Sequence, residues 1–524
     1  MRLLLAGVAG ALTLLALAGP AAAEWRRAES EHFIVYSDGR ESVLRDYVRK
    51  LEIFDRILRA EIRTTGEPVR KLPIFLVGGE NALRQVHPDL PRFAAGVYLP
   101  TSEDIFAVAI RNQGDDVMLH EYVHHLMFQN AVSAYPAWLV EGFAEYYAAS
   151  VFRSDEVVVG GFNSGRVNAL AAGNWIPVRS LLTQTYREIR GSGQVTYYPL
   201  AWLMTHWFMG TEERRGLLLA YLNDVGAGMP SLEAMEKATG LTPEQFERTL
   251  RSYFNSSVPQ RIRAIENSEI ALAVTVLPDS ANDLLLINQR LRIGAPDGQR
   301  AAIAAEVRRR AARHPDDPLA LLALGHAEVH FGDPAAGEVA LERLLQLEPG
   351  HVEALQLMAT RYFSLAATRP EERTRLMGRG RSYLARAYQA DPENYYTLIL
   401  LGQSREGAAT YPNENDIATW FQADERAPQL PAARLGLARA LMQAGHGEAA
   451  AVILPALANA PHGGAASDAA KILLARALAG EPPLSEEEIR TATEEQVEQG
   501  PDTPAEPEGE PTEPAAEPET APPA

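Results

Sequence analysis

A repeating pattern of prolines in the second half of the chain constrains the fold more than any other feature. From about Ala301 the sequence is rich in Ala and Leu, and its prolines are spaced by 34, 43, 36 and 33 residues, at Pro315, Pro349, Pro392, Pro428 and Pro461. Such a period is typical of stacked helical pairs, because each pair buries its apolar face only against a neighbour. We therefore expect residues 301–480 to form a curved array of helical repeats, with a plain all-α bundle as the alternative.

Segments of this array resemble tetratricopeptide repeats. The residues that carry the resemblance are Leu321, Leu324, Gly325, Leu341, Leu344 and Pro349, and segments around Leu384 and Trp420 repeat the second half of the pattern. The resemblance implies an all-α tetratricopeptide-like solenoid. Its concave surface would suit an extended peptide or a protein partner.

The two ends of the chain differ in composition from the rest. Residues 1–23 have a basic start, an apolar run shorter than the roughly 20 residues that span a bilayer, and small residues before Glu24. This pattern predicts a signal peptide and a soluble protein, exported to the periplasm or secreted, without a transmembrane segment in the mature chain. Residues 481–524 hold 14 acidic residues, one basic residue and ten prolines, and carry most of the formal charge of −19. We expect this acidic tail to be disordered, and we expect no nucleic-acid partner.

The region between, residues 24–262, begins as an α/β unit. We expect, in chain order, a strand, an amphipathic helix, a second strand and a hairpin, at residues 32–36, 41–62, 72–77 and 94–110. Residues 263–300 are expected to be a connecting helical segment. The chain has no cysteine, so His, Asp and Glu are the only strong ligands that it offers to a metal.

An HExxH sequence at residues 120–124 lies within an expected helix over residues 117–129. Residues four apart lie on one face of a helix, so His120 and His124 point to the same place. Two neutral imidazoles suit Zn²⁺, which lowers the pKa of a bound water toward roughly 7, and Glu121 can accept a proton from that water.

A catalytic zinc needs a third protein ligand, and a second motif downstream offers two carboxylates. Glu141 and Glu145 are four residues apart, so one can bind the metal while the other supports a histidine. The metzincin pattern is absent, since Met127 and Asn130 stand where it needs glycine and histidine.

HEYVHH and the later EGFAEYY, with 16 residues between His124 and Glu141, resemble the gluzincin zinc metallopeptidases. This group contains thermolysin and the aminopeptidase N family, and the resemblance is greatest to its peptidase MA-like branch, over about residues 30–255. It implies an α+β metallopeptidase domain with one Zn²⁺ per chain. It also implies that Glu141 is the third zinc ligand and that Glu145 hydrogen-bonds a zinc-binding histidine, with Glu145 as the direct ligand as the alternative.

The resemblance extends to the segment around Arg166 and to a later helix start at Tyr198. In aminopeptidase relatives a tyrosine at such a position stabilises the oxyanion, which implies this role for Tyr198, with the adjacent Tyr197 as the alternative. His125 points about 100° away from His124 on the helix, so we interpret it as a packed or exposed histidine. His206, His326 and His351 we interpret as ordinary helix residues without a ligand-spaced partner.

These interpretations together predict a multidomain chain in which a gluzincin-type domain precedes a helical-repeat array. The predicted function is that of an exported zinc metallopeptidase acting on a peptide or protein substrate. Internal cleavage is favoured, because Gly78-Gly79-Glu80-Asn81 fits a strand-to-helix turn better than a motif that anchors a substrate amine. The alternatives are a tetratricopeptide scaffold with a structural or vestigial zinc domain, and a cell-envelope amidase with the same zinc chemistry.

Overall fold

The structure is a computed structural model that describes residues 24–62, 70–90, 94–111, 113, 115–130, 135–162, 164–256, 260–265, 269–460, 463–485, 487–489 and 491. The predicted signal peptide and most of the predicted acidic tail lie outside these residues. The chain divides into two compact units, residues 1–483 and 484–524. In the second unit, the main-chain N–H and the hydroxyl of Ser485 each donate a hydrogen bond of 2.7 Å to the carboxylate of Glu488.

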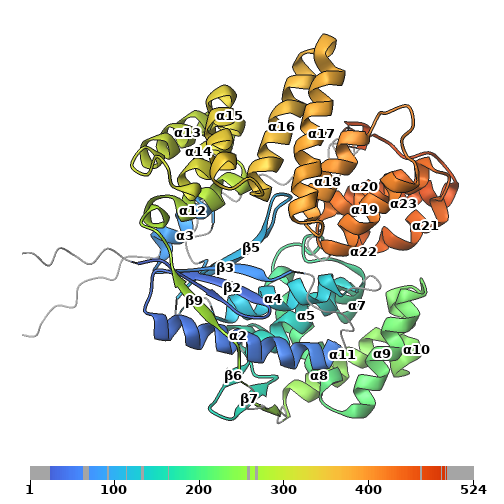
Figure 1. Ribbon diagram of the computed structural model, residues 1–524. Coiled ribbons are helices and arrows are strands. Elements are labelled where there is room, and N and C mark those ends of the chain that lie inside the picture. Colours follow the sequence, from blue (N-terminus) through green and yellow to red (C-terminus); the bar gives the residue numbers. More distant parts are fainter. Residues whose placement is uncertain are drawn as a thin grey trace, which may run out of the picture. The chain divides into compact units, whose positions relative to one another are not determined.

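A six-stranded mixed sheet lies in the N-terminal half of the first unit, with the strand order β4-β5-β3-β2-β1-β9 (Figure 1). The strands are β1 (Arg26–Glu29), β2 (Phe33–Ser37), β3 (Leu72–Val77), β4 (Gly96–Pro100), β5 (Ile105–Ile110) and β9 (Ala273–Val276). The pairs β2–β3 and β3–β5 are parallel, and the remaining pairs are antiparallel. β5 is buried along its whole length, as expected for an apolar strand covered on both faces. The edge strands are β4 and β9.

Several elements agree with the sequence predictions. The strand predicted at 72–77 is β3, the hairpin predicted at 94–110 is β4 with β5, and the helix predicted at 41–62 is α2 (Glu41–Ile62). Along α2 the buried apolar residues recur every three or four positions, at Leu44, Val48, Leu51, Phe54 and Leu58. The segment Gly78-Gly79 joins β3 to α3 (Glu80–Val86), which is the strand-to-helix turn that the sequence indicates.

The segment 263–300 differs from its prediction as a helical connection. It contains β9, which pairs with β1, and it becomes helical only from α12 (Ser280–Ile293) onward. The run Ala-Val-Thr-Val is short and three of its four residues are exposed, so it has neither the length nor the alternating burial that identifies a strand from sequence.

Three helices position the residues of interest: α4 (Asp115–Gln129), α5 (Ala137–Ala148) and α8 (Gly193–Met209). α5 packs against both α4 and α8. Its approach to α8 depends on Gly142, because a Cβ added there would lie 2.3 Å from Thr205 Oγ1 and 2.4 Å from the Ala201 carbonyl oxygen. Only a residue without a side chain fits at this crossing.

Smaller elements complete the N-terminal half. A three-stranded sheet has the order β6-β7-β8, from β6 (Val151–Phe152), β7 (Glu156–Val159) and β8 (Arg261–Ala264). The remaining helices there are α6 (Ser164–Ala171), α7 (Val178–Thr183), α9 (Glu212–Gly226), α10 (Ser231–Thr239) and α11 (Pro243–Phe254).

The C-terminal half of the first unit is all-α and consists of helices that pack in pairs. They are α13 (Asp297–Ala311), α14 (Pro318–Phe331), α15 (Pro334–Leu347), α16 (Val352–Thr368), α17 (Arg373–Ala390), α18 (Tyr395–Arg405), α19 (Glu414–Arg426), α20 (Pro431–Gln443), α21 (Gly447–Ile453), α22 (Pro455–Ala458) and α23 (Ala465–Ala479), with η1 (Pro370–Glu372) before α17. Small residues allow close packing: a Cβ added at Gly402 or at Gly436 would lie 2.4 Å from the ring of Trp420. This half is therefore a helical-repeat array, as the proline spacing predicts.

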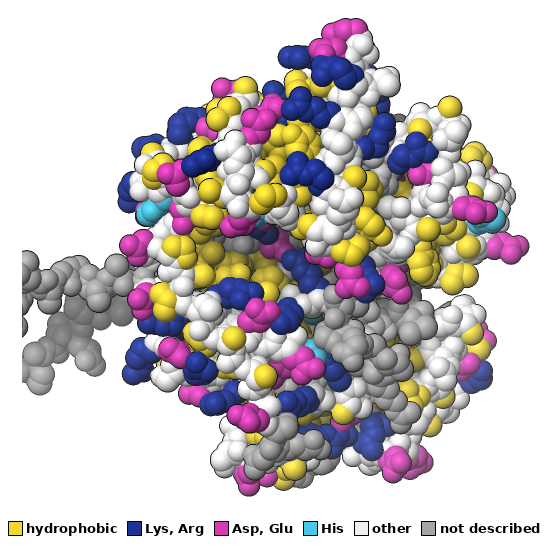
Figure 2. Space-filling view, in the orientation of Figure 1, with side chains coloured by type: hydrophobic (Ala, Val, Ile, Leu, Met, Phe, Trp, Pro, Cys, Tyr) yellow, Lys and Arg dark blue, Asp and Glu magenta, His cyan; other side chains and the backbone are white. Residues whose placement is uncertain are grey.

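None of the helices within the described ranges is both long enough and apolar enough to cross a bilayer. Figure 2 shows acidic and basic side chains interspersed over the face that it presents. That face therefore carries no extended surface of a single charge sign.

The turn between β4 and β5 contacts the helical array. Asp104 in this turn accepts hydrogen bonds from Arg70, at 2.6 Å, and from Arg292 of α12, at 2.5 Å. Arg292 also donates to Glu353 of α16, at 2.7 Å. The guanidinium of Arg70 lies 5.1 Å from the ring centre of Tyr395 in α18. Ion pairs that are largely shielded from solvent thus hold the tip of the hairpin against the array.

Candidate metal centre

His120 and His124 of α4 and Glu141 of α5 bring three ligand atoms together. The Nε2 atoms of the two histidines are 3.0 Å apart. Glu141 Oε2 lies 3.5 Å from each of them. His124 and Glu141 are buried, while His120 is partly exposed. Helical spacing accounts for the two histidines, and the packing of α5 on α4 supplies the carboxylate.

These distances fit a tetrahedral zinc site. Bonds of about 2.0 to 2.1 Å in tetrahedral geometry separate neighbouring ligand atoms by about 3.3 Å. The three separations of 3.0, 3.5 and 3.5 Å each lie within a few tenths of that value. The donor set, two imidazoles and one carboxylate, is also one that zinc accepts with its fourth position open. The residues present therefore fit the metal that the sequence implies.

The charges around His120 are those of a cation site. Burial alone would lower the pKa of His120, but the carboxylates of Glu141, Glu145 and Glu121 raise it above its ordinary value. The acidic groups thus favour a positive charge at this place, which a proton or a metal ion can supply.

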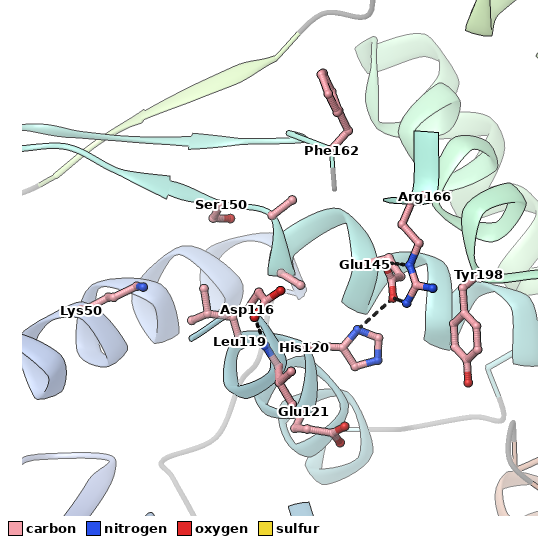
Figure 3. Close-up of a pocket in the computed structure, with 13 residues that line it drawn as sticks. Lys50, Asp116, Leu119, His120, Glu121, Glu145, Ser150, Phe162, Arg166 and Tyr198 are labelled. Atoms are coloured by element: carbon pink, nitrogen blue, oxygen red, sulfur yellow. Dashed lines mark hydrogen bonds and ion pairs between the residues drawn. The ribbon is translucent and has the colours of Figure 1, made fainter. Parts of the chain in front are cut away.

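Glu145 lies behind His120, on the side away from the converging ligand atoms. Its Oε1 is 3.5 Å from His120 Nδ1, and Arg166 of α6 donates two hydrogen bonds to its carboxylate, at 2.6 and 3.0 Å (Figure 3). This arrangement orients the ring of His120 from its second nitrogen. The sequence alone indicates no role for Arg166, because its contact with Glu145 depends on how α6 packs.

Tyr198 and Tyr197, adjacent at the start of α8, have different surroundings. Tyr198 lines the same cleft as His120 and Glu121, and Figure 3 shows all three side chains facing one space. Burial, together with the negative charge of Glu141, raises the pKa of Tyr198 well above its ordinary value, so its hydroxyl stays protonated at neutral pH. Tyr197 is buried, and its hydroxyl donates to the Gln184 carbonyl oxygen at 3.2 Å. Of the two, Tyr198 is the one placed toward the cleft.

The cleft has a volume of about 640 Å³. Its polar wall includes Asp116, Glu121 and Glu145, and its apolar wall includes Leu119 and Phe162. Its size is sufficient for several residues of an extended peptide or for another small substrate.

No family model matches the sequence, and no curated protein matches it significantly. Among solved structures, the chain is similar to a tetratricopeptide-repeat protein of Thermus thermophilus. The two are 20% identical over 38% of this chain and 98% of that chain, with a TM-score of 0.31.

His125 follows the two clustered histidines and points elsewhere. It is buried, and its Nδ1 lies 2.9 Å from the hydroxyl of Tyr98 in β4. Burial, with the positive charges of Arg70 and Arg59, lowers the pKa of His125 to about 3, so the ring is neutral at physiological pH. Of the packed and exposed positions expected for His125, the structure shows the packed one.

Proposed function

We propose that this chain is an exported zinc-dependent peptidase in which His120, His124 and Glu141 hold the metal. The observation that supports this most strongly is the convergence of the three ligand atoms, with distances that suit tetrahedral zinc. Glu121 next to this cluster adds to the support, because a purely structural zinc has no need of a general base.

Each residue of the cleft then has a task in hydrolysis. A zinc ion bound here would polarise the scissile carbonyl and acidify a water molecule. Glu121 would act as the general base that takes a proton from the attacking water and returns it to the leaving amine. The protonated hydroxyl of Tyr198 donates a hydrogen bond to the oxyanion as negative charge develops on it. Glu145, held by Arg166, keeps His120 in the orientation that metal binding needs.

The sheet edge offers a way to align an extended substrate. Among the described strands, β4 pairs only with β5, and it packs beside α4, which carries His120 and His124. A peptide that added to this edge would bind through its main chain, largely independently of its sequence. Such binding requires no free substrate terminus and therefore favours internal cleavage.

The test compares Glu121→Gln with the unaltered full-length chain. The substitution keeps size and hydrogen bonding but removes the base, so we expect zinc to stay bound while cleavage of a denatured protein substrate falls by at least about 100-fold. Glu213→Gln, an exposed change on α9, is the matched control. Zinc content is measured by mass spectrometry and cleavage by the appearance of peptides. Unchanged cleavage by Glu121→Gln would show that the hydrolysis does not use this site.

A scaffold is the second candidate function, and the helical-repeat array of α13 to α23 favours it. In that case the array binds a protein partner and the zinc region is structural or vestigial. Glu121→Gln separates the two candidates, because a scaffold would keep both its partner and its cellular role. Release of fragments from purified peptidoglycan by the unaltered chain would instead indicate an amidase.

A further inference from the structure

Two histidines of α14 and one glutamate of the β4–β5 turn form a second cluster of possible metal ligands. His326 and His330 are four residues apart, on one face of the helix. His326 Nε2 lies 3.1 Å from Glu103 Oε2, and His330 Nε2 lies 3.8 Å from Glu103 Oε1. One ligand atom from each residue lies within 4.8 Å of the other two. The interpretation of His326 as lacking a ligand-spaced partner is therefore wrong.

His326 is buried, but the residues around it do not satisfy the hydrogen bonding of its ring nitrogens. Its side chain is 1% exposed, and neither ring nitrogen makes a hydrogen bond within the described part of the chain. The approach of Glu103 at 3.1 Å is an ion-pair distance without hydrogen-bond geometry. A buried imidazole whose nitrogens make no hydrogen bond is costly, and a metal ion bound at Nε2 would satisfy the nitrogen that faces Glu103.

The donor groups of the cluster suit a metal. Glu103 offers a carboxylate oxygen, and His326 and His330 each offer an imidazole nitrogen. The nearby cation Arg292 is already paired with Asp104 and Glu353.

The cluster on α14 is similar to the cluster at His120 and His124 and differs from the group around His32. The ring centres of His326 and His330 are 5.1 Å apart, close to the 4.7 Å between His120 and His124. A third group, around His32, is explained without a metal, because Glu52 accepts hydrogen bonds from both the ring and the main chain of His32, at 2.7 and 2.9 Å. In the cluster on α14, by contrast, no hydrogen bond within the described residues satisfies the ring nitrogens of the buried His326.

We propose that Glu103, His326 and His330 bind a second divalent transition-metal ion, zinc by its donor set, which ties the β4–β5 turn to α14. Two imidazoles and one carboxylate are typical zinc ligands, and water would complete the coordination. The ion would act beside the ion pairs of Asp104 and fasten the hairpin to the helical array. The full chain then holds two ions where the sequence implies one, and this site does not depend on the proposed peptidase activity.

The test is a count of bound zinc in the full-length chain after chelator treatment and dialysis against Zn²⁺ alone. We expect two ions per unaltered chain, one in the Glu103→Gln, His330→Gln double variant, and one in the His120→Gln, His124→Gln double variant. His314→Gln is the matched control, because this histidine of the same array lies 2.8 Å from the single carboxylate of Asp283, outside the proposed sites. It should keep both ions.

The melting temperature shows whether a lost ion reflects misfolding. His330 is partly exposed, so the His330→Gln single variant should melt like the unaltered chain in chelator, and only the rise on adding Zn²⁺ should become smaller. Equal zinc counts in the Glu103→Gln, His330→Gln variant and the unaltered chain would overturn the proposal. Loss of zinc only from the His120 and His124 variant would do the same. An unaltered chain that binds one ion, which the His120 and His124 variant keeps and the Glu103 and His330 variant loses, would reject the proposed peptidase site alone.

Discussion

Replacing Gly142 with alanine tests whether the crossing of α5 and α8 sets the geometry of the metal centre. The added Cβ would lie 2.4 Å from the Ala201 carbonyl oxygen, whereas ordinary contacts begin at 3.4 Å. The two helices must therefore separate by about 1 Å. Overpacking of this kind costs about 1–3 kcal/mol, and we expect the upper end because main-chain atoms of α8 have to move. A loss of about 3 kcal/mol corresponds to a fall of roughly 3–6 °C in melting temperature, because a compact unit of this size has a large entropy of unfolding.

The same displacement should affect the metal centre, because Glu141 precedes Gly142 on α5. A misplacement of about 1 Å can reduce the rate of a positioned reaction by about 100-fold. The assay measures melting temperature by circular dichroism, zinc affinity by chelator competition, and peptide cleavage. Gly216→Ala on α9 is the control, since nothing lies within 4 Å of its added Cβ and alanine favours a helix. If Gly142→Ala melts, binds zinc and cleaves like the unaltered chain, the crossing does not determine the site.

Three further predictions concern single side chains. Arg166→Gln removes both hydrogen bonds that Arg166 donates to Glu145. We expect zinc binding, measured by chelator competition, to weaken by roughly 10- to 100-fold. Unchanged zinc affinity would mean that Glu145 does not orient His120. Tyr198→Phe should lower kcat by about 100-fold with little change in KM. Tyr197→Phe should affect mainly the melting temperature. The reverse result would assign the oxyanion role to Tyr197. Burial lowers the pKa of His206 below 6.5, so its contribution to stability is complete above pH 6.5 and is lost as the pH falls toward the lower folded pKa. In chelator, the melting temperature of His206→Gln should therefore fall less between pH 7 and pH 5 than that of the unaltered chain, and parallel curves would contradict this.

The spacing of residues along the chain predicted the features that depend on a single helix. The helix at 41–62 and the pairing of His120 with His124 depend on spacing along one helix, and the structure contains both. The choice between Glu141 and Glu145 depends on how α5 packs on α4, which spacing alone does not reveal. The same holds for Glu103, whose approach to His326 joins a hairpin turn to a helix far along the chain. The metal-binding and catalytic roles of these residues remain predictions.

The position of β9 at the sheet edge has a consequence for the order in which this protein is made. Residue 276 pairs with residue 26, so the sheet stays incomplete until almost 280 residues have been synthesised. Until then the outer side of β1 is an unpaired strand edge that can join another chain. A fragment that ends at residue 262 would retain this open edge permanently and should aggregate, whereas one that continues through α12 to residue 293 supplies the covering strand. The end of the shortest fragment that contains the whole sheet is therefore set by β9 and not by the last residue of the metal centre.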